Sequence, residues 1–163
     1  MDKKIALTGH TGLVGRSIAL AFEKTVGFSR ANGYDIRSDR EKIIAAAMHC
    51  DVFVNCAHGG PGFAQTEMFW DIFNIWRDDP TKYIINIGSD SADISMWNLV
   101  RDRYSSEKSA LLSAVESAQR MPHACKVSVI NPNVCTPAVL DDLIALINFC
   151  ICSKSEIKNV NLQ

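Results

Sequence analysis

The chain of 163 residues predicts an α/β fold, with a doubly wound parallel sheet in a single domain covering residues 1–163. Three observations support this prediction. Short runs rich in valine and isoleucine alternate with longer segments of helical periodicity along the whole chain. The apolar runs are continuous, which is typical of strands buried on both faces of a sheet. No linker, repeat or low-complexity stretch divides the sequence.

The predicted strands are short apolar runs bounded by turn residues or by charged residues. The run at 83–87 is the clearest, because it is apolar apart from one asparagine and is followed by glycine. We expect strands at 4–8, 25–29, 51–56, 83–87, 126–130 and 156–160, with a further very short one at 34–36.

The predicted helices lie between these strands. Ser38 and Asp39 are residue types that cap a helix N-terminus, so they mark the start of the second helix. The segment after 101 is the strongest candidate, with Leu111, Leu112 and Val115 on one side. We expect helices at 13–24, 39–49, 66–76, 101–120 and 137–150.

Composition narrows the class of protein. Hydrophobic residues make up 47% of the chain and charged residues 21%, as in ordinary globular domains. A net charge of -1 and scattered basic residues argue against nucleic acid or a membrane surface as a partner. The six cysteines form no CxxC pair, so we expect free thiols, no bound metal and a reducing, cytoplasmic location without a signal peptide.

A glycine-rich turn follows the first strand and opens the first helix. Gly9, Gly12 and Gly15 stand in the TGxxGxxG spacing. Such a turn lets the backbone approach a pyrophosphate at a helix N-terminus, so it predicts a Rossmann-like dinucleotide site. The alternative is a glycine loop that only turns the chain. The predicted contacts here are Thr8, Gly9, Thr11, Gly12, Leu13, Val14 and Gly15.

The end of the second strand indicates which dinucleotide binds. Sites for NAD usually place an acid there, but this chain has Ser29 and Arg30 and no acid before Asp35. Arg30 can pair with a 2′-phosphate, with Ser29 and Arg16 assisting. The sequence therefore favours NADP over NAD as the cofactor. Arg30 as a merely solvated loop residue is the alternative.

Ser89, Tyr104 and Lys108 form the predicted catalytic set. Tyr104 and Lys108 are one helical turn apart, so their side chains emerge on the same face. An ammonium near the phenol stabilises its phenolate, which makes tyrosine a usable acid and base at neutral pH. Ser89 ends a strand at the edge where such sheets bind ligands, and it can donate to a reacting oxygen. Ser91 competes with Ser89 for this role.

Taken together, these motifs resemble the short-chain dehydrogenase/reductase family over nearly the whole chain, in the glycine pattern of its extended, nucleotide-sugar branch. The resemblance implies that Asp35 and Ile36 contact adenine and that Lys108 also holds the nicotinamide ribose. It further implies a weaker candidate, Asn74, for a fourth catalytic residue. The remaining contacts that it implies are Asn55, Ala57, His58, Gly59, Pro132, Asn133 and Val134.

The chain also departs from the family pattern. Asn133 replaces a glycine, Thr136 lies one position closer to Pro132 than usual, and only one helix and one strand are expected after this motif. The substrate-binding region therefore looks truncated. A partner subunit or a large substrate would have to close it.

Two functions remain open at this point. The first is an NAD(P)(H)-dependent oxidoreductase that acts on a carbonyl/alcohol pair, with a sugar nucleotide as one candidate substrate. The second is a non-catalytic sensor or regulatory protein that binds NAD(P). We expect a homodimer or homotetramer with a small-molecule substrate. The helix at 101–120 or the aromatic helix around Trp70 would form the interface, although Phe69, Trp70, Phe73 and Trp76 also suit the core.

Overall fold

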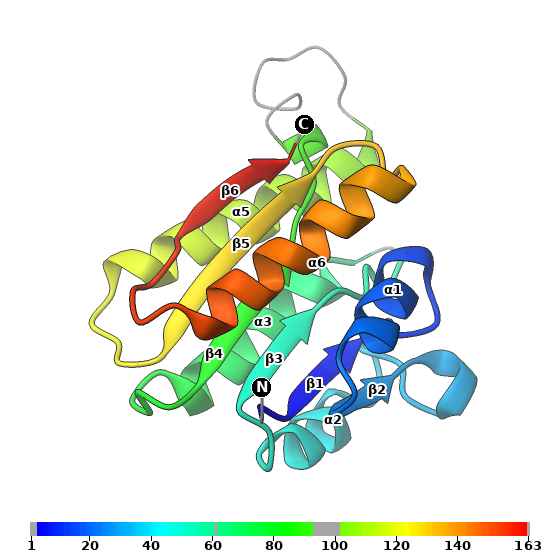
Figure 1. The fold of residues 1–163 in the computed structure, drawn as a ribbon. Helices are drawn as coiled ribbons and strands as arrows, with labels where there is room; N and C mark the ends of the chain where they lie inside the picture. The colour runs from blue at the N-terminus through cyan, green and yellow to red at the C-terminus, as the bar shows by residue number, and fades with distance from the viewer. Residues whose placement is uncertain (1–2, 61, 93–101, 163) are drawn as a thin grey trace.

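A computed structural model describes residues 3–60, 62–92 and 102–162. Its centre is a parallel sheet of six strands in the order β2-β1-β3-β4-β5-β6 (Figure 1). This is the predicted doubly wound α/β architecture. The strands are β1 (Ile5–Thr8), β2 (Thr25–Phe28), β3 (Val52–Asn55), β4 (Tyr83–Ile87), β5 (Lys126–Pro132) and β6 (Asn159–Leu162).

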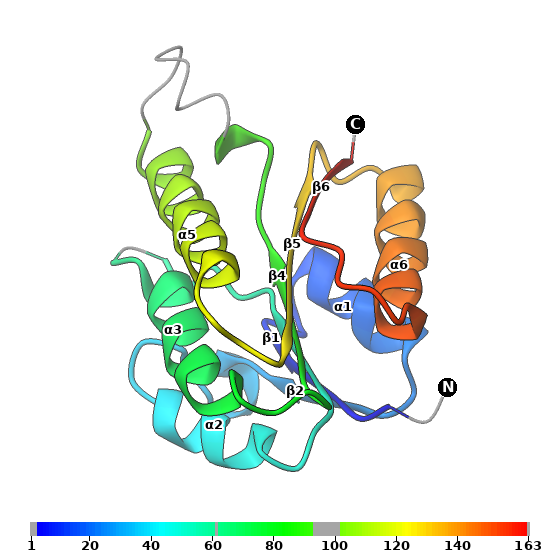
Figure 2. The ribbon, with the colours of Figure 1, turned by 90° about the vertical axis from the view of Figure 1, so that its left-hand side faces the viewer.

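Helices cover both faces of the sheet, as Figure 2 shows edge-on. On one face lie α1 (Leu13–Ala21) and α6 (Pro137–Cys152). On the other lie α2 (Arg40–Ala47), α3 (Ala64–Trp76) and α5 (Arg103–Arg120). A short 3-10 helix, η1 (Arg30–Asn32), follows β2.

Each helical layer closes its own apolar core against the sheet. Phe53 and Ile84 face α2, α3 and α5 in the larger core. Val54 and Ile85 belong to the core beneath α1 and α6. Successive strand residues thus point to opposite cores, which explains why the strands read as continuous apolar runs.

The short strand expected at 34–36 is wrong. Ser29 N donates to Asn32 Oδ1 at 2.8 Å, and Gly33 turns the chain with a φ of 86°. Tyr34 N then donates back to Ser29 O at 2.9 Å, so the local hydrogen bonds are used within a turn. Two polar residues and a glycine outweigh the strand propensity of Tyr34 and Ile36.

The other elements match the prediction to within a few residues. β6 begins later than expected, because the Glu156 carboxylate accepts from the Val127 N–H at 2.9 Å before the ladder starts. α5 begins at Arg103, after Asp102 caps it by accepting from Ser105 N at 2.7 Å. Arg101, where we expected that helix to begin, lies outside the described residues, as does Pro61 in the predicted loop.

The aromatic cluster on α3 belongs mainly to the core. Phe69, Phe73 and Trp76 are at most 1% exposed, and Trp70 is packed against them. Of the two interpretations of these aromatic residues, the structure favours the core, since α5 packs against α3 beside them.

This topology fixes where a ligand can bind. β1 has β2 on one side and β3 on the other, so the chain changes direction across the sheet between these strands. The carboxyl ends of the strands on either side of such a switch point border a crevice. In the described part of the chain, no helix is long and apolar enough to cross a membrane.

Candidate active site

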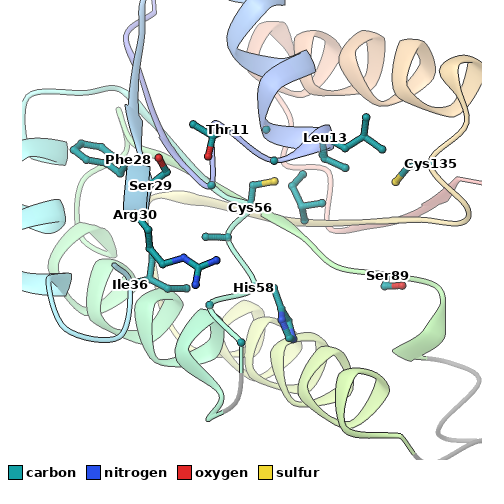
Figure 3. Close-up of a pocket in the computed structure, with 18 of the residues that line it drawn as sticks. Thr11, Leu13, Phe28, Ser29, Arg30, Ile36, Cys56, His58, Ser89 and Cys135 are labelled. Carbon is teal, nitrogen blue, oxygen red and sulfur yellow. The ribbon is translucent and has the colours of Figure 1, made fainter. Parts of the chain in front are cut away.

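A cleft of about 1080 Å³ lies at the carboxyl ends of β1 to β5. Its floor is the turn after β1, one end is formed by the residues after β2, and the other by Ser89 and α5 (Figure 3). We call these the β2 end, around Ser29 to Ile36, and the Tyr104 end, around Ser89, Tyr104 and Lys108. The cleft therefore lies at the topological switch point of the sheet.

The glycine turn is fixed by close backbone contacts. Gly9 has a φ of 74° and lies against Ala57, where a Cβ would meet the Ala57 backbone at 3.0 Å. A Cβ on Gly15 would stand 2.2 Å from Gly9 O, so only glycine fits there. A Cβ on Gly12 would meet only Gly9 O, at an ordinary 3.4 Å, and would project into the cleft. Gly9 and Gly15 thus shape the turn, while Gly12 keeps the cleft floor open.

The β2 end has groups that suit a nucleotide. Arg30 is exposed, and its guanidinium points into the cleft in Figure 3. Phe28 and Tyr34 pack edge to face, with ring centroids 5.1 Å apart. Asp35 pairs with Arg37, with Nη2 2.7 Å from Oδ2, and this hydrogen bond lowers the pKa of the Asp35 carboxyl to about 2. Asp35 is therefore an acceptor at any physiological pH.

At the Tyr104 end, Ser89 and Tyr104 both line the cleft. Tyr104 is 43% exposed because its phenol opens onto the cleft. The protein around it still raises the pKa of Tyr104 through desolvation, which the neighbouring Ser89 hydroxyl partly offsets. Ser91 lies behind this pair, donating from Oγ to Ser89 Oγ at 2.8 Å. The geometry therefore favours Ser89, with Ser91 orienting it.

Lys108 is held from below the cleft. It is 4% exposed, and its Nζ donates to Gln65 Oε1 and to Ile87 O, each at 2.9 Å. The Nζ lies 5.6 Å from the centroid of the Tyr104 ring. Desolvation by burial lowers the pKa of Lys108 to about 8. The ammonium is thus close to the phenol and only weakly hydrated, where its charge acts strongly.

Gln65 organises this region, although no pattern in the sequence distinguishes it. Its Nε2 donates to Asn55 O at 2.8 Å and to Ile87 O at 3.0 Å. Asn55 Nδ2 returns a hydrogen bond to Gln65 O at 2.9 Å. The start of α3 is thereby tied to the ends of β3 and β4, and Gln65 Oε1 remains directed at Lys108.

Glu107 is a second unexpected residue. Its side chain is 5% exposed, and Oε2 lies 2.7 Å from His58 Nε2. The His58 ring rests against Tyr104, with centroids 5.0 Å apart. Desolvation, followed by the charge of Lys108, lowers the pKa of His58, so the ring is mainly neutral at pH 7.

Most of the predicted site residues line the cleft, but three do not. Thr8 is fully buried, and its Oγ1 accepts from Cys56 N at 3.0 Å and Ala57 N at 3.1 Å, joining β1 to the end of β3. Asn55 is also buried, and Val134 projects outward at 73% exposure. Those lining it are Gly9, Thr11, Gly12, Leu13, Val14, Gly15, Ser29, Arg30, Asp35, Ile36, Ala57, His58, Gly59, Ser89, Tyr104, Lys108, Pro132 and Asn133.

The weaker candidates lie elsewhere. Asn74 is exposed in the last turns of α3 and does not line the cleft, so Gln65 rather than Asn74 is the amide near Lys108. Arg16 is exposed and also stands outside the cleft lining. Thr136 caps α6 by accepting from Val139 N at 3.3 Å. Cys56 and Cys135 do line the cleft, and burial raises the pKa of Cys56 to about 11, so its thiol stays protonated.

No protein-family model and no curated protein matches this sequence. Solved structures do match. The 3-ketoacyl-(acyl-carrier-protein) reductase from Brucella melitensis, complexed with NADH, has a TM-score of 0.70 at 17% identity, over 99% of this chain and 96% of that one. A serine dehydrogenase from Escherichia coli has a TM-score of 0.69 at 14% identity, over 97% of this chain and 96% of that one. A short-chain dehydrogenase from Streptomyces avermitilis has a TM-score of 0.68 at 17% identity, over 99% of this chain and 89% of that one.

The chain has the short-chain dehydrogenase/reductase fold. Within this fold, the cleft of the present chain occupies the carboxyl edge of the sheet and ends at Ser89 and Tyr104. Identities of 14% to 17% establish the fold alone. Within this short-chain dehydrogenase/reductase fold, the roles of individual residues depend on the geometry of the chain's own cleft.

Proposed function

We propose that this protein is an NAD(P)(H)-dependent oxidoreductase that interconverts a carbonyl compound and the corresponding alcohol. The observation that carries the proposal is the grouping of Ser89, Tyr104 and the buried Lys108 at one end of a cleft floored by a glycine turn. A phenol that can give the oxygen its proton, a hydroxyl that can donate to the oxygen and an ammonium that stabilises the phenolate are suited to carbonyl reduction.

The cleft suits a dinucleotide. The N-terminus of α1 supplies free N–H groups above Gly12, where a side chain would occupy the space of a pyrophosphate. Ser29, Arg30, Asp35 and Ile36 would hold the adenosine half, and Lys108 and Asn133 would lie near the nicotinamide half. When bound, the nicotinamide supplies or accepts the hydride.

The protein residues handle the oxygen and the proton. In the reducing direction Ser89 donates a hydrogen bond to the carbonyl oxygen, and Tyr104 gives that oxygen its proton as the alcohol forms. In the reverse direction the Tyr104 phenolate removes the alcohol proton. Lys108 stabilises the phenolate in both directions by its charge, which the low-dielectric surroundings leave poorly screened.

We propose NADP rather than NAD as the preferred cofactor. Support comes from Arg30, whose guanidinium points into the β2 end, and from Ser29, whose side chain borders the same space. A 2′-phosphate would gain charge-assisted hydrogen bonds from Arg30. Asp35 is the first acidic residue in the sequence after β2, and its charge is balanced by Arg37, so it would repel a 2′-phosphate only weakly.

Replacing Tyr104 with phenylalanine tests the proposal directly. The variant removes the proton-transfer group and keeps the ring against His58, so cofactor affinity should stay within a few-fold while turnover falls by about 10²-fold or more. A screen of NADPH oxidation against carbonyl compounds, including keto forms of sugar nucleotides, supplies the substrate. Full turnover in the variant would assign the proton to another group. Cofactor binding without turnover on any substrate would favour the sensor hypothesis.

We also propose that the protein forms a homodimer or homotetramer. With the α3 rings in the core, the remaining support is the frequency of closed symmetric dimers and the long solvent-facing side of α5. Light scattering at micromolar concentration should report a multiple of 18.0 kDa. A particle of the monomer mass would contradict this prediction.

A further inference from the structure

Glu107 is a buried carboxylate that the proposed chemistry does not use. It stands on α5 between Tyr104 and Lys108, and its side chain is 5% exposed. Oε2 lies 2.7 Å from His58 Nε2, and Oε1 accepts from Gly62 N at 3.1 Å, with Arg103 Nε at 3.3 Å. A buried charge is costly unless it is compensated, and here the Gly62 amide and the Arg103 guanidinium compensate the Glu107 carboxylate.

Two of these contacts hold the loop between β3 and α3. That loop relies on left-handed backbone, with φ of 78° at Gly59, 75° at Gly60 and 113° at Gly62. Phe63 also has a φ of 59°, a backbone conformation that is unfavourable for a residue with a side chain. A glycine-rich loop has many other conformations available to it. Glu107 selects one of them by contacting the loop near both of its ends, at His58 and Gly62.

The same loop touches both ends of the cleft. A Cβ on Gly59 would meet Ile36 Cδ1 at 2.7 Å, so the loop backbone is packed against the β2 end. One residue earlier, the His58 ring lies against Tyr104 at 5.0 Å. Figure 3 shows Ile36 and His58 bordering the same part of the cleft. Ile36 and His58 are thus separated by the single peptide unit that links His58 to Gly59.

We propose that Glu107 and His58 are positioning residues that couple occupation of the β2 end by the adenosine half of the cofactor to the orientation of the Tyr104 ring. This inference rests on the proposed function, because it needs a nucleotide at the β2 end. Glu107 acts through His58 and touches no reacting atom. The coupling places Tyr104 for proton transfer only when the cleft is filled. Couplings between two sites typically change the affinity at one of them about five-fold or more, and we expect a coupling of that size here.

The three tyrosines of the chain allow a test without any substrate. Tyr34 lines the β2 end, Tyr83 is buried at the start of β4, and Tyr104 touches His58. In protein labelled with ¹³C in its tyrosine rings, the probe is adenosine 2′,5′-bisphosphate, which has no nicotinamide half. It should shift the Tyr34 signal by direct contact and the Tyr104 signal through the movement of the His58 ring, and leave Tyr83 unchanged. The Tyr104→Phe variant assigns the signal.

Glu107→Gln should lose the Tyr104 response and keep the Tyr34 response. The same exchange at Glu116, on the exposed side of α5, is the matched control and should preserve both responses. His58→Phe keeps a ring beside Tyr104 but loses the contact with Glu107, so it should behave like Glu107→Gln and serves if that variant does not fold. Adding Glu107→Gln to His58→Phe should then change little, as two parts of one contact are non-additive.

The outcomes separate the two proposals. A Tyr104 response of wild-type size in Glu107→Gln or His58→Phe, with Tyr34 responding normally, overturns the coupling and leaves the oxidoreductase proposal intact. The absence of any Tyr34 response in the wild-type protein at millimolar probe overturns nucleotide binding at the β2 end, and the coupling with it.

Discussion

The two ends of the cleft are built in opposite ways. At the β2 end, Arg30 is exposed, and Asp35 is balanced by Arg37 two residues away. At the Tyr104 end, Lys108 is 4% exposed and is held by Gln65, which lies 43 positions away in the sequence. The Arg30 side chain at the β2 end can therefore change without disturbing the core, whereas Lys108 at the Tyr104 end is part of the buried interior. Mutations at the β2 end should therefore change nucleotide preference with little effect on the stability of the fold, whereas mutations at the Tyr104 end should change both catalysis and stability.

The largest expected effect lies between the two ends, at Gly12. Gly12→Val should abolish cofactor binding, because its side chain would project into the cleft where the pyrophosphate approaches. Since a Cβ at this position would make only an ordinary contact, the variant should keep a cooperative unfolding transition. Calorimetric titration with NADPH measures the loss. Unchanged affinity would show that the glycine turn is not a phosphate site.

The Tyr104 end should reveal itself in the pH dependence of stability. The folded pKa of Lys108, about 8, is below its ordinary 10.5, so between these values the unfolded chain binds more protons than the folded one. The contribution of Lys108 to the free energy of unfolding therefore rises with pH, by about 3 kcal/mol from below pH 8 to above pH 10.5.

Urea unfolding of the wild type and of Lys108→Met at pH 7 and pH 10.5 measures this change. Subtracting the variant removes the titration of other groups, and Lys154→Met, at an exposed position, controls for the loss of one positive charge. A stability difference that stays constant with pH would mean that Lys108 is charged and well solvated in the folded protein.

The β2 end should show the smallest effect, confined to binding. Arg30→Ala should narrow the preference for NADP over NAD by roughly 1–3 kcal/mol, the value of a charge-assisted phosphate contact, with little change in the unfolding midpoint. Arg77→Ala, at the end of α3 and outside the cleft lining, is the matched control. Equal wild-type affinities for the two cofactors would exclude a 2′-phosphate site at Arg30.

The sequence predicted the framework of the cleft because its signals are local. The glycine turn, the apolar strand before Ser89 and the helical spacing of Tyr104 and Lys108 each lie within a few residues. The order of strands and helices then follows from the rules for parallel sheets. The failed strand at 34–36 is also local, but the outcome depended on hydrogen bonds between Ser29 and Asn32 that propensity does not weigh.

The supporting residues could not be found in this way. Gln65 and Glu107 are ordinary helix residues in the sequence, and their partners are brought to them only by the fold. Glu107 meets Gly62 across 45 positions and Gln65 meets Lys108 across 43. No periodicity or motif encodes such pairs. The residues that line the cleft could therefore be predicted from the sequence, whereas the residues that hold those side chains in place could not.

The contact of Thr8 with the end of β3 has a consequence for how the protein folds. Thr8 Oγ1 accepts from the amides of Cys56 and Ala57, so the glycine turn acquires its final support only from residues 48 and 49 positions later. During synthesis, β1 and β2 can pair early, but the turn cannot be completed until β3 has left the ribosome. Folding is slowed because the entropy of closing that long loop is lost before the stabilising contacts form. The motif most easily recognised in the sequence should therefore become ordered only after β3 has been synthesised, and not when the motif itself emerges.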